Sequence, residues 1–162
     1  MLIREATPED WPAIWPIFRA VVAAGDSYAY PENLDSAQAE ALWMAVPPAR
    51  TVVACDPDGA ILGTAKMGPN RDGRGSHVAT ASFMVSPEAR GGGVGRALGE
   101  HMIAWARDNG YRGVQFNAVV ETNTAAVALW RELGFDVVGT VPDAFDHSEH
   151  GYVGLHVMYR SL

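Results

Sequence analysis

The chain has 162 residues, 48% of them hydrophobic, which predicts one folded domain over residues 1–162. Its 12 Lys and Arg against 19 Asp and Glu give a formal net charge of −7, which argues against nucleic acid or an anionic membrane as the main partner. The lone Cys55 excludes an intrachain disulfide framework, and the start of the chain has no signal-peptide pattern, so we expect a cytoplasmic location.

The first quarter of the chain predicts a strand followed by two helices. Residues 2–6 read as a strand, and Thr7 then offers an N-cap before an apolar stripe with helical spacing. We expect Pro16 to bend or shorten that helix, because proline lacks an amide donor. A second helix is predicted from Asp35 or Ser36 to about Val46, where two prolines follow.

The middle of the chain predicts three strands and a long helix. Residues 51–56 and 60–67 are rich in β-branched and small apolar residues and are joined by turn-forming residues, which favours a hairpin. Residues 77–85 form a third extended segment. Apolar residues at helical spacing from Gly93 to the Asn109-Gly110 terminator predict an amphipathic helix.

The last third of the chain adds a strand, a helix and two further strands. We expect a buried strand over 113–120, a helix capped by Asn123 and ended at Gly134, and strands over 136–141 and 153–160. The predicted order is β-α-α-β-β-β-α-β-α-β-β. This order indicates an α/β fold, of α+β character in its mixed sheet, with helices on both faces.

A glycine-rich loop, Arg90-Gly91-Gly92-Gly93-Val94-Gly95-Arg96, lies between a strand and a helix, where backbone amides and the helix dipole attract phosphate. The side chains of Arg90 and Arg96 would add charge-assisted contacts. Three phosphate-binding patterns compete. Walker A needs Gly-Lys-Ser/Thr, whereas Arg96 follows Gly95 here, and the dinucleotide pattern G-x-G-x-x-G fits in neither register. The pattern Arg/Gln-x-x-Gly-x-Gly/Ala is met by Arg90, Gly93 and Gly95, although a plain glycine-rich loop is the alternative interpretation.

With these elements in this order, the chain resembles the GNAT superfamily of acyl-CoA-dependent N-acyltransferases over nearly its whole length. Residues 85–98 look like the family's pyrophosphate motif, and residues 123–135 look like its second cofactor motif. The resemblance implies a central sheet splayed between the strands at 78–85 and 113–120. It also implies acetyl-CoA as cosubstrate.

The resemblance implies the following donor contacts. Backbone groups near Met84 and Val85 would pair with the pantetheine arm, and the amides of residues 91–96 (Gly91, Gly92, Gly93, Val94, Gly95 and Arg96) would hold the pyrophosphate. Asn123 would contact the pantetheine region or serve only as an N-cap. The Val85 amide would polarise the thioester carbonyl, for direct transfer without an acyl-enzyme.

The acid and base of the reaction stay unassigned. The family often has a tyrosine acid where this chain has Trp130, and an indole N–H does not donate a proton at neutral pH, so we expect a pocket wall there. The tyrosines at 28, 30 and 152 lie in predicted loops that could close over the site. The base candidates lie on or beside the splayed strands: His77, Glu121, and a water held by Thr80 or Gln115.

Two further chemistries are not expected. Cys55 lies in an apolar strand without a nearby histidine, which favours a buried structural thiol. The run Asp146-His147-Ser148-Glu149-His150 is not a known zinc pattern, so we expect a solvated loop and no metal.

Residues 66–70, 77–85 and 116–123 more weakly resemble fungal acetyltransferases acting on proline analogues. That resemblance implies substrate contacts at Asn117 and Thr80, although the group has asparagine at the position of Thr80. Tyr28 and Tyr30 complete the expected substrate wall. We therefore expect an N-acetyltransferase that acts on a small amine or amino acid in a ternary complex. The alternatives are a protein or peptide amine, or a catalytically silent CoA-binding module. We also expect a homodimer, with an edge strand around 153–160 as the contact.

Overall fold

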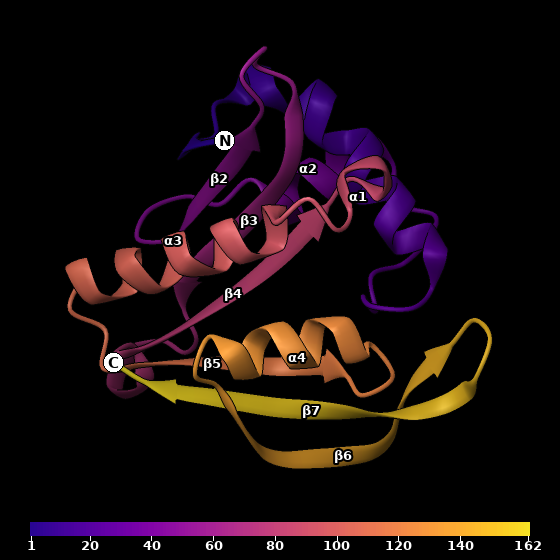
Figure 1. The fold of residues 1–162 in the computed structure, drawn as a ribbon, viewed down its shortest axis with the longest axis vertical. Coiled ribbons are helices and arrows are strands. Elements are labelled where there is room, and N and C mark those ends of the chain that lie inside the picture. Colours follow the sequence, from indigo (N-terminus) through magenta and orange to yellow (C-terminus); the bar gives the residue numbers. More distant parts are fainter.

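The computed structural model describes all 162 residues, which build one seven-stranded sheet and four α-helices (Figure 1). The strands are β1 (Leu2–Glu5), β2 (Arg50–Cys55), β3 (Ile61–Pro69), β4 (Val78–Val85), β5 (Gly113–Val120), β6 (Asp136–His147) and β7 (Gly151–Ser161). The helices are α1 (Trp11–Ala24), α2 (Ser36–Trp43), α3 (Val94–Asp108) and α4 (Thr124–Glu132). The predicted order of elements and the mixed α/β class are confirmed. None of the helices is long and apolar enough to cross a membrane.

The strands lie in the order β1-β2-β3-β4-β5-β7-β6, and every neighbouring pair is antiparallel except β4 and β5. These two parallel strands pair only at their beginnings, where Val78 faces Gly113 and Ala79 faces Val114. Beyond that point they diverge, as Figure 1 shows. The predicted splay of the central sheet is therefore confirmed.

Both faces of the sheet carry an apolar layer, because strand residues alternate between them. On one face, Val53, Cys55 and Met84 pack with α1 and α2 in a cluster of 11 buried residues. On the other, Ala65 and Met67 join α3 and α4 in a cluster of 17. In Figure 1, α3 and α4 lie in front of the sheet. The buried, unpaired thiol of Cys55 agrees with its expected structural role.

The first helix differs from the expectation at Pro16, since α1 continues through this residue to Ala24 and ends at Gly25 with φ 64°. The proline removes one hydrogen bond, worth about 1 kcal/mol net. Several buried side chains on the same helix, such as Ile14 and Phe18, each contribute about 1.5–3 kcal/mol. Burial therefore outweighs the missing bond.

The second helix ends at Trp43, three residues earlier than predicted. The hydroxyl of Thr51, on β2, donates to the Trp43 carbonyl at 2.8 Å and accepts from the Ala45 amide at 2.9 Å. A side chain from another element thus supplies the partners that a further helical turn would have used.

The C-terminal strand is not an edge strand. β7 lies between β5 and β6, paired with both, so the expectation of an exposed edge around 153–160 is wrong. The hairpin formed by β6 and β7 places the later strand inside the sheet and leaves β6 at the edge.

Candidate active site

A cavity of about 590 Å³ occupies the opening between β4 and β5. Its walls come from the two strands, the α1–α2 connection, the N-terminus of α4 and the end of the β6–β7 hairpin. Arg90, from the glycine-rich loop, also belongs to this lining. We call the part of the lining that comes from the α1–α2 connection and the hairpin the acceptor end: Asp26, Ser27, Tyr28, Ala29, Tyr30, Phe145 and His147.

The free edge of β4 presents backbone groups to this opening. The Ser86 amide donates to the Leu62 carbonyl, and the Asn70 amide donates to the Val78 carbonyl, both at 2.8 Å. These two bonds between β3 and β4 show which residues of β4 turn their backbone groups toward β3 and which turn them away. Even-numbered residues therefore turn their backbone groups to β3, and odd-numbered residues turn theirs to the gap. Met84 lines the cavity with other atoms, but its backbone faces β3, so the expected pairing at Met84 is wrong and Val85 is the residue turned to the gap.

Tyr28, from the α1–α2 connection, binds the backbone of Phe83 on β4. Its hydroxyl accepts from the Phe83 amide at 2.7 Å and donates to the Phe83 carbonyl at 2.8 Å. Burial raises the pKa of the Tyr28 hydroxyl above its ordinary value, so this group stays protonated. Of the odd-numbered residues beside the gap, Phe83 is thus satisfied within the chain, while Ala81 and Val85 lie beyond the pairing with β5.

The N-terminus of α3 is open. Its N-cap is Gly93, with φ 79° and no side chain to cap the helix, and the Ala97 amide donates to the Gly93 carbonyl. The three amides before Ala97 therefore have no partner within the helix. A Cβ placed on Gly91 or Gly93 would meet no atom within 4 Å, so there is free space beside this loop.

Two groups that were expected to contact phosphate already have partners within the chain. The Gly92 amide donates to the Ala89 carbonyl at 3.2 Å, which closes a turn. The guanidinium of Arg96 pairs with Glu132 and bridges α3 to α4. Arg90 makes no ion pair and lines the cavity.

The start of α4 provides a capped helix and one orphan hydroxyl. Asn123 accepts from the Ala126 amide at 3.2 Å, so its N-cap role is confirmed, and it also lines the cavity. The hydroxyl of neighbouring Thr122 is buried without any hydrogen-bond partner, and Thr122 belongs to the same lining. A buried hydroxyl without a partner costs about 1–3 kcal/mol, so a polar ligand group at this point would be favoured.

Trp130 forms part of an aromatic wall. Its ring centroid lies 4.8 Å from both Phe83 and Phe116, and the residue is 7% exposed. It also lines the cavity. This packing agrees with the expected role of a pocket wall.

The hairpin end and the end of α1 are held together at the acceptor end. The Ser148 hydroxyl donates to the Ala24 carbonyl and the Ser148 amide to the Gly25 carbonyl, each at 2.9 Å. The next residues along the chain, Asp26 to Tyr30, line the cavity. The rings of Tyr28 and Tyr30 stack with centroids 5.8 Å apart.

The sequence-predicted polar residues separate into two groups. Thr80 and Asn117 line the cavity. The side-chain amide of Asn117 donates to the side chain of Asn70 at 2.7 Å and accepts from the side chain of Gln115 at 2.9 Å. Four other candidates are not among the lining residues: Gln115, His77, Glu121 and Tyr152. Glu121 instead accepts from the Gly154 amide at 2.6 Å, and Tyr152 is 71% exposed.

His147 is a site residue that the sequence analysis missed. Expected in a solvated loop, it is 9% exposed, lines the cavity and accepts from the Glu149 amide through Nδ1 at 3.0 Å. The available signal was the period of two along β6, which turns Phe145 and His147 inward together. No group of three or more His, Cys, Asp or Glu is placed to hold a metal ion.

Comparison with known proteins finds the following similarities. A family model described as acetyltransferase (GNAT) family matches residues 9–135. A solved structure of a GCN5-related N-acetyltransferase from Kribbella flavida is 60% identical, with a TM-score of 0.97 over 99% of this chain and 97% of that one. A phosphinothricin acetyltransferase from Sinorhizobium meliloti, solved in complex with AcCoA, is 26% identical, with a TM-score of 0.88 over 99% and 88%.

Curated relatives differ in how much of their length this chain covers. The L-methionine sulfoximine/L-methionine sulfone acetyltransferase of Pseudomonas paraeruginosa is 32% identical over 145 residues, which make up 86% of this chain and 83% of the relative. Three other curated relatives are longer, and the chain spans 47%, 13% and 28% of their lengths.

Proposed function

The chain belongs to the acetyltransferase (GNAT) family, and from this premise we propose that it transfers an acetyl group from acetyl-CoA to the amine of a small molecule. The observation that carries the proposal is the open N-terminus of α3 beside a cavity that lies between β4 and β5. A Cβ on Gly95, in the first turn of that helix, would lie 3.9 Å from the Val85 side chain, so the loop and the free strand edge are neighbours.

The donor end fits acetyl-CoA in three respects. The unpartnered amides of Val94, Gly95 and Arg96, with the free guanidinium of Arg90, suit a diphosphate. The backbone of Val85 suits the amide groups of a pantetheine arm, which would add to β4 like a strand. The buried hydroxyl of Thr122 would gain a partner from such a ligand.

The chemistry follows from the nature of a thioester and an amine. The ammonium group first loses one proton, and the uncharged amine then forms a bond to the carbonyl carbon. The carbon–sulfur bond breaks, the nitrogen gives up its second proton, and the leaving thiolate takes up one. The Val85 amide is our proposed donor to the carbonyl oxygen, where negative charge develops. Trp130 would shape the wall beside the reacting atoms and exclude water. The groups that move the two protons stay unassigned.

Two observations favour a small acceptor over a protein chain. The acceptor end is bridged by the hydrogen bonds from Ser148 to Ala24 and Gly25. In addition, the relatives similar over most of this chain include two that are named for small amino-acid analogues. We keep a cytoplasmic location as part of the proposal, because the chain's one cysteine is unpaired.

The test is calorimetric titration with acetyl-CoA, ATP and NAD, comparing Gly93→Asp with Gly73→Asp. Both glycines have positive φ and open space around the Cβ position, so the backbone cost of the two substitutions is similar. Only Gly93 caps α3. We expect selective acetyl-CoA binding that falls at least about 100-fold in Gly93→Asp and is unchanged in Gly73→Asp.

A thiol-release assay with a panel of amines then separates the enzyme from the alternatives. Release that depends on a small amine supports the proposal. Tight acetyl-CoA binding without release above background for any amine would indicate a silent CoA-binding module. No acetyl-CoA binding would overturn the proposal.

A further inference from the structure

The cavity lining contains one cationic and one acidic side chain. Among all the residues that line it, Arg90 is the only Lys or Arg and Asp26 is the only Asp or Glu. Arg90 comes from the glycine loop, and Asp26 belongs to the acceptor end. A ligand that contacts the acceptor end therefore meets an acidic side chain there and no Lys or Arg.

The segments around the acceptor end have the same sign as Asp26. Residues 25–35, between α1 and α2, contain three acidic residues and no Lys or Arg. Residues 142–152, at the end of the β6–β7 hairpin, contain another three acidic residues and again no Lys or Arg. These two segments are joined by the hydrogen bonds of Ser148, so their charges belong to one region. The negative potential that they create attracts cations to the cavity.

Asp26 itself has no partner in the chain. The ion pairs of the structure join Arg4 to Asp10, Arg50 to Glu5 and Arg96 to Glu132, and no side-chain hydrogen bond to Asp26 is present. Residue Asp26 is half-buried, and a cationic ligand group would give its carboxylate a partner through a charge-assisted hydrogen bond.

The aromatic lining points to the same kind of ligand. The rings of Tyr28, Tyr30 and Phe145 line the acceptor end together with Asp26. Tyr28 is fixed in place by its two hydrogen bonds to Phe83 and stacks on Tyr30. Aromatic rings attract ammonium groups, and Asp26 lies two residues before Tyr28 in the same lining segment. No Lys or Arg is present at this end to hold a substrate carboxylate.

Resting on the proposed function, we infer that the acceptor is a small diamine or polyamine whose second ammonium group binds Asp26 beside the tyrosine rings. The reacting ammonium group loses one proton, the resulting amine bonds to the acetyl carbon, and the nitrogen loses a second proton as the carbon–sulfur bond breaks and the thiolate takes up a proton. The second ammonium keeps its charge throughout. An α-amino acid would instead bring its carboxylate into the acidic end. The acceptor thus differs in charge from the amino-acid analogues for which two relatives are named.

The experiment compares three amines of equal length, 1,4-diaminobutane, butylamine and 4-aminobutyrate, by initial rates of thiol release with acetyl-CoA. They differ only in the end group, which is cationic, apolar or anionic. We expect kcat/KM for the diamine to exceed that for butylamine at least about tenfold, and that for 4-aminobutyrate by more. In Asp26→Asn the advantage of the diamine should disappear, while butylamine changes less than about twofold.

The control is Asp58→Asn, the same change in the exposed turn between β2 and β3, which should leave the preference intact. The inference is overturned if 4-aminobutyrate or L-methionine sulfoximine is acetylated as well as the diamine. It is also overturned if Asp26→Asn keeps the wild-type preference. Acetyl-CoA affinity of the same samples separates the two failures. A wrong preference with normal acetyl-CoA binding refutes only the acceptor class, whereas absent binding refutes the proposed function as well.

Discussion

The two ends of the cavity are built in different ways. The phosphate-binding part of the donor end comes from one stretch, residues 90–96, and uses mainly backbone amides at the start of α3. The acceptor end brings together Asp26 to Tyr30 and the β6–β7 hairpin, and one of the bonds that joins these two segments spans 124 residues of sequence. Backbone amides recognise a phosphate whatever the acceptor is, whereas side chains select the acceptor. The difference places the constant part of the reaction in a local motif and its specificity in tertiary structure.

The largest effect is expected from Gly25→Ala, which should disturb the acceptor end and leave the donor end intact. Gly25 has φ 64°, and a Cβ there would lie 3.0 Å from the Cβ of Ser148. The hairpin should move away from α1, raising KM for the amine about tenfold and lowering stability by about 1–2 kcal/mol. Acetyl-CoA affinity should stay unchanged.

Gly110→Ala is the matched control for Gly25→Ala. Gly110 has φ 76° and no atom within 4 Å of a Cβ, so it carries a similar backbone cost without the collision. Steady-state kinetics of both variants, with urea denaturation, provide the comparison. Equal amine KM values in the two variants would contradict the role of the Gly25–Ser148 contact.

An effect mainly on stability is expected from Tyr28→Phe, which removes one hydroxyl between β4 and the acceptor end. The Phe83 amide and carbonyl would both lose their partner, at a cost of about 1–3 kcal/mol measured by urea denaturation. Tyr30→Phe is the control, because the Tyr30 hydroxyl makes no hydrogen bond in the structure and should be nearly neutral. Equal stabilities of the two variants would refute the bridging role of Tyr28.

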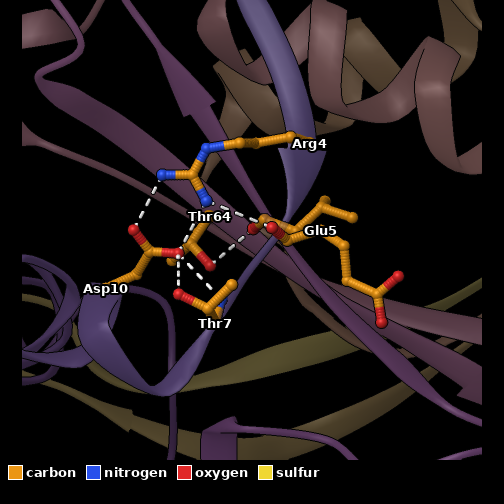
Figure 2. A network of polar contacts seen from close by, with 6 residues as sticks. Arg4, Glu5, Thr7, Asp10 and Thr64 are labelled. Carbon is orange, nitrogen blue, oxygen red and sulfur yellow. Dashed lines mark hydrogen bonds and ion pairs between the residues drawn. The ribbon is translucent and has the colours of Figure 1, made fainter.

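The smallest effect is expected outside the cavity, at the network in Figure 2. Two hydrogen bonds of 2.7 and 2.8 Å join Arg4 to Asp10, and the Thr7 amide donates to Asp10 at 2.8 Å. Arg4 lowers the pKa of Asp10 to about 2. In contrast to Asp26, this carboxylate is fully partnered, so it should contribute to stability and not to substrate binding.

We expect Asp10→Asn to cost about 1 kcal/mol at neutral pH, because the arginine is partly exposed, and to leave kinetics unchanged. The folded pKa lies below the unfolded value of about 3.9, so the contribution is present above that pH and is lost as the pH falls toward 2. Urea denaturation should therefore show a gap between wild type and variant that is nearly constant from pH 7 to pH 5 and shrinks between pH 4.5 and pH 2. A gap that stays constant over the lower range would contradict the assigned pKa.

What sequence could predict follows the same division. The order of elements and the glycine loop were predictable, because apolar periodicity and the glycines at 91 and 93 are local signals. The partners of Gly92 and Arg96 were not predictable from the sequence. The hydrogen bond of the Gly92 amide and the ion pair of Arg96 with Glu132 depend on how the loop and α4 are placed.

The acceptor end was predictable only as a list of separate residues. Tyr28 and Tyr30 were expected near the substrate, but nothing local indicates that one binds Phe83 while the other has a free hydroxyl. His147 was assigned to solvent because its burial depends on the docking of the hairpin on α1. Asp26 gave no signal at all, since an acidic residue in a loop is common until a cavity is seen beside it.

The central claim is that one cavity holds the acetyl donor and the amine at the same time, from opposite ends. The most direct test is an initial-rate study of thiol release in which acetyl-CoA and 1,4-diaminobutane are both varied. Direct transfer between two bound substrates predicts reciprocal plots that intersect. Parallel lines would show that the first product leaves before the amine binds, and would contradict the account.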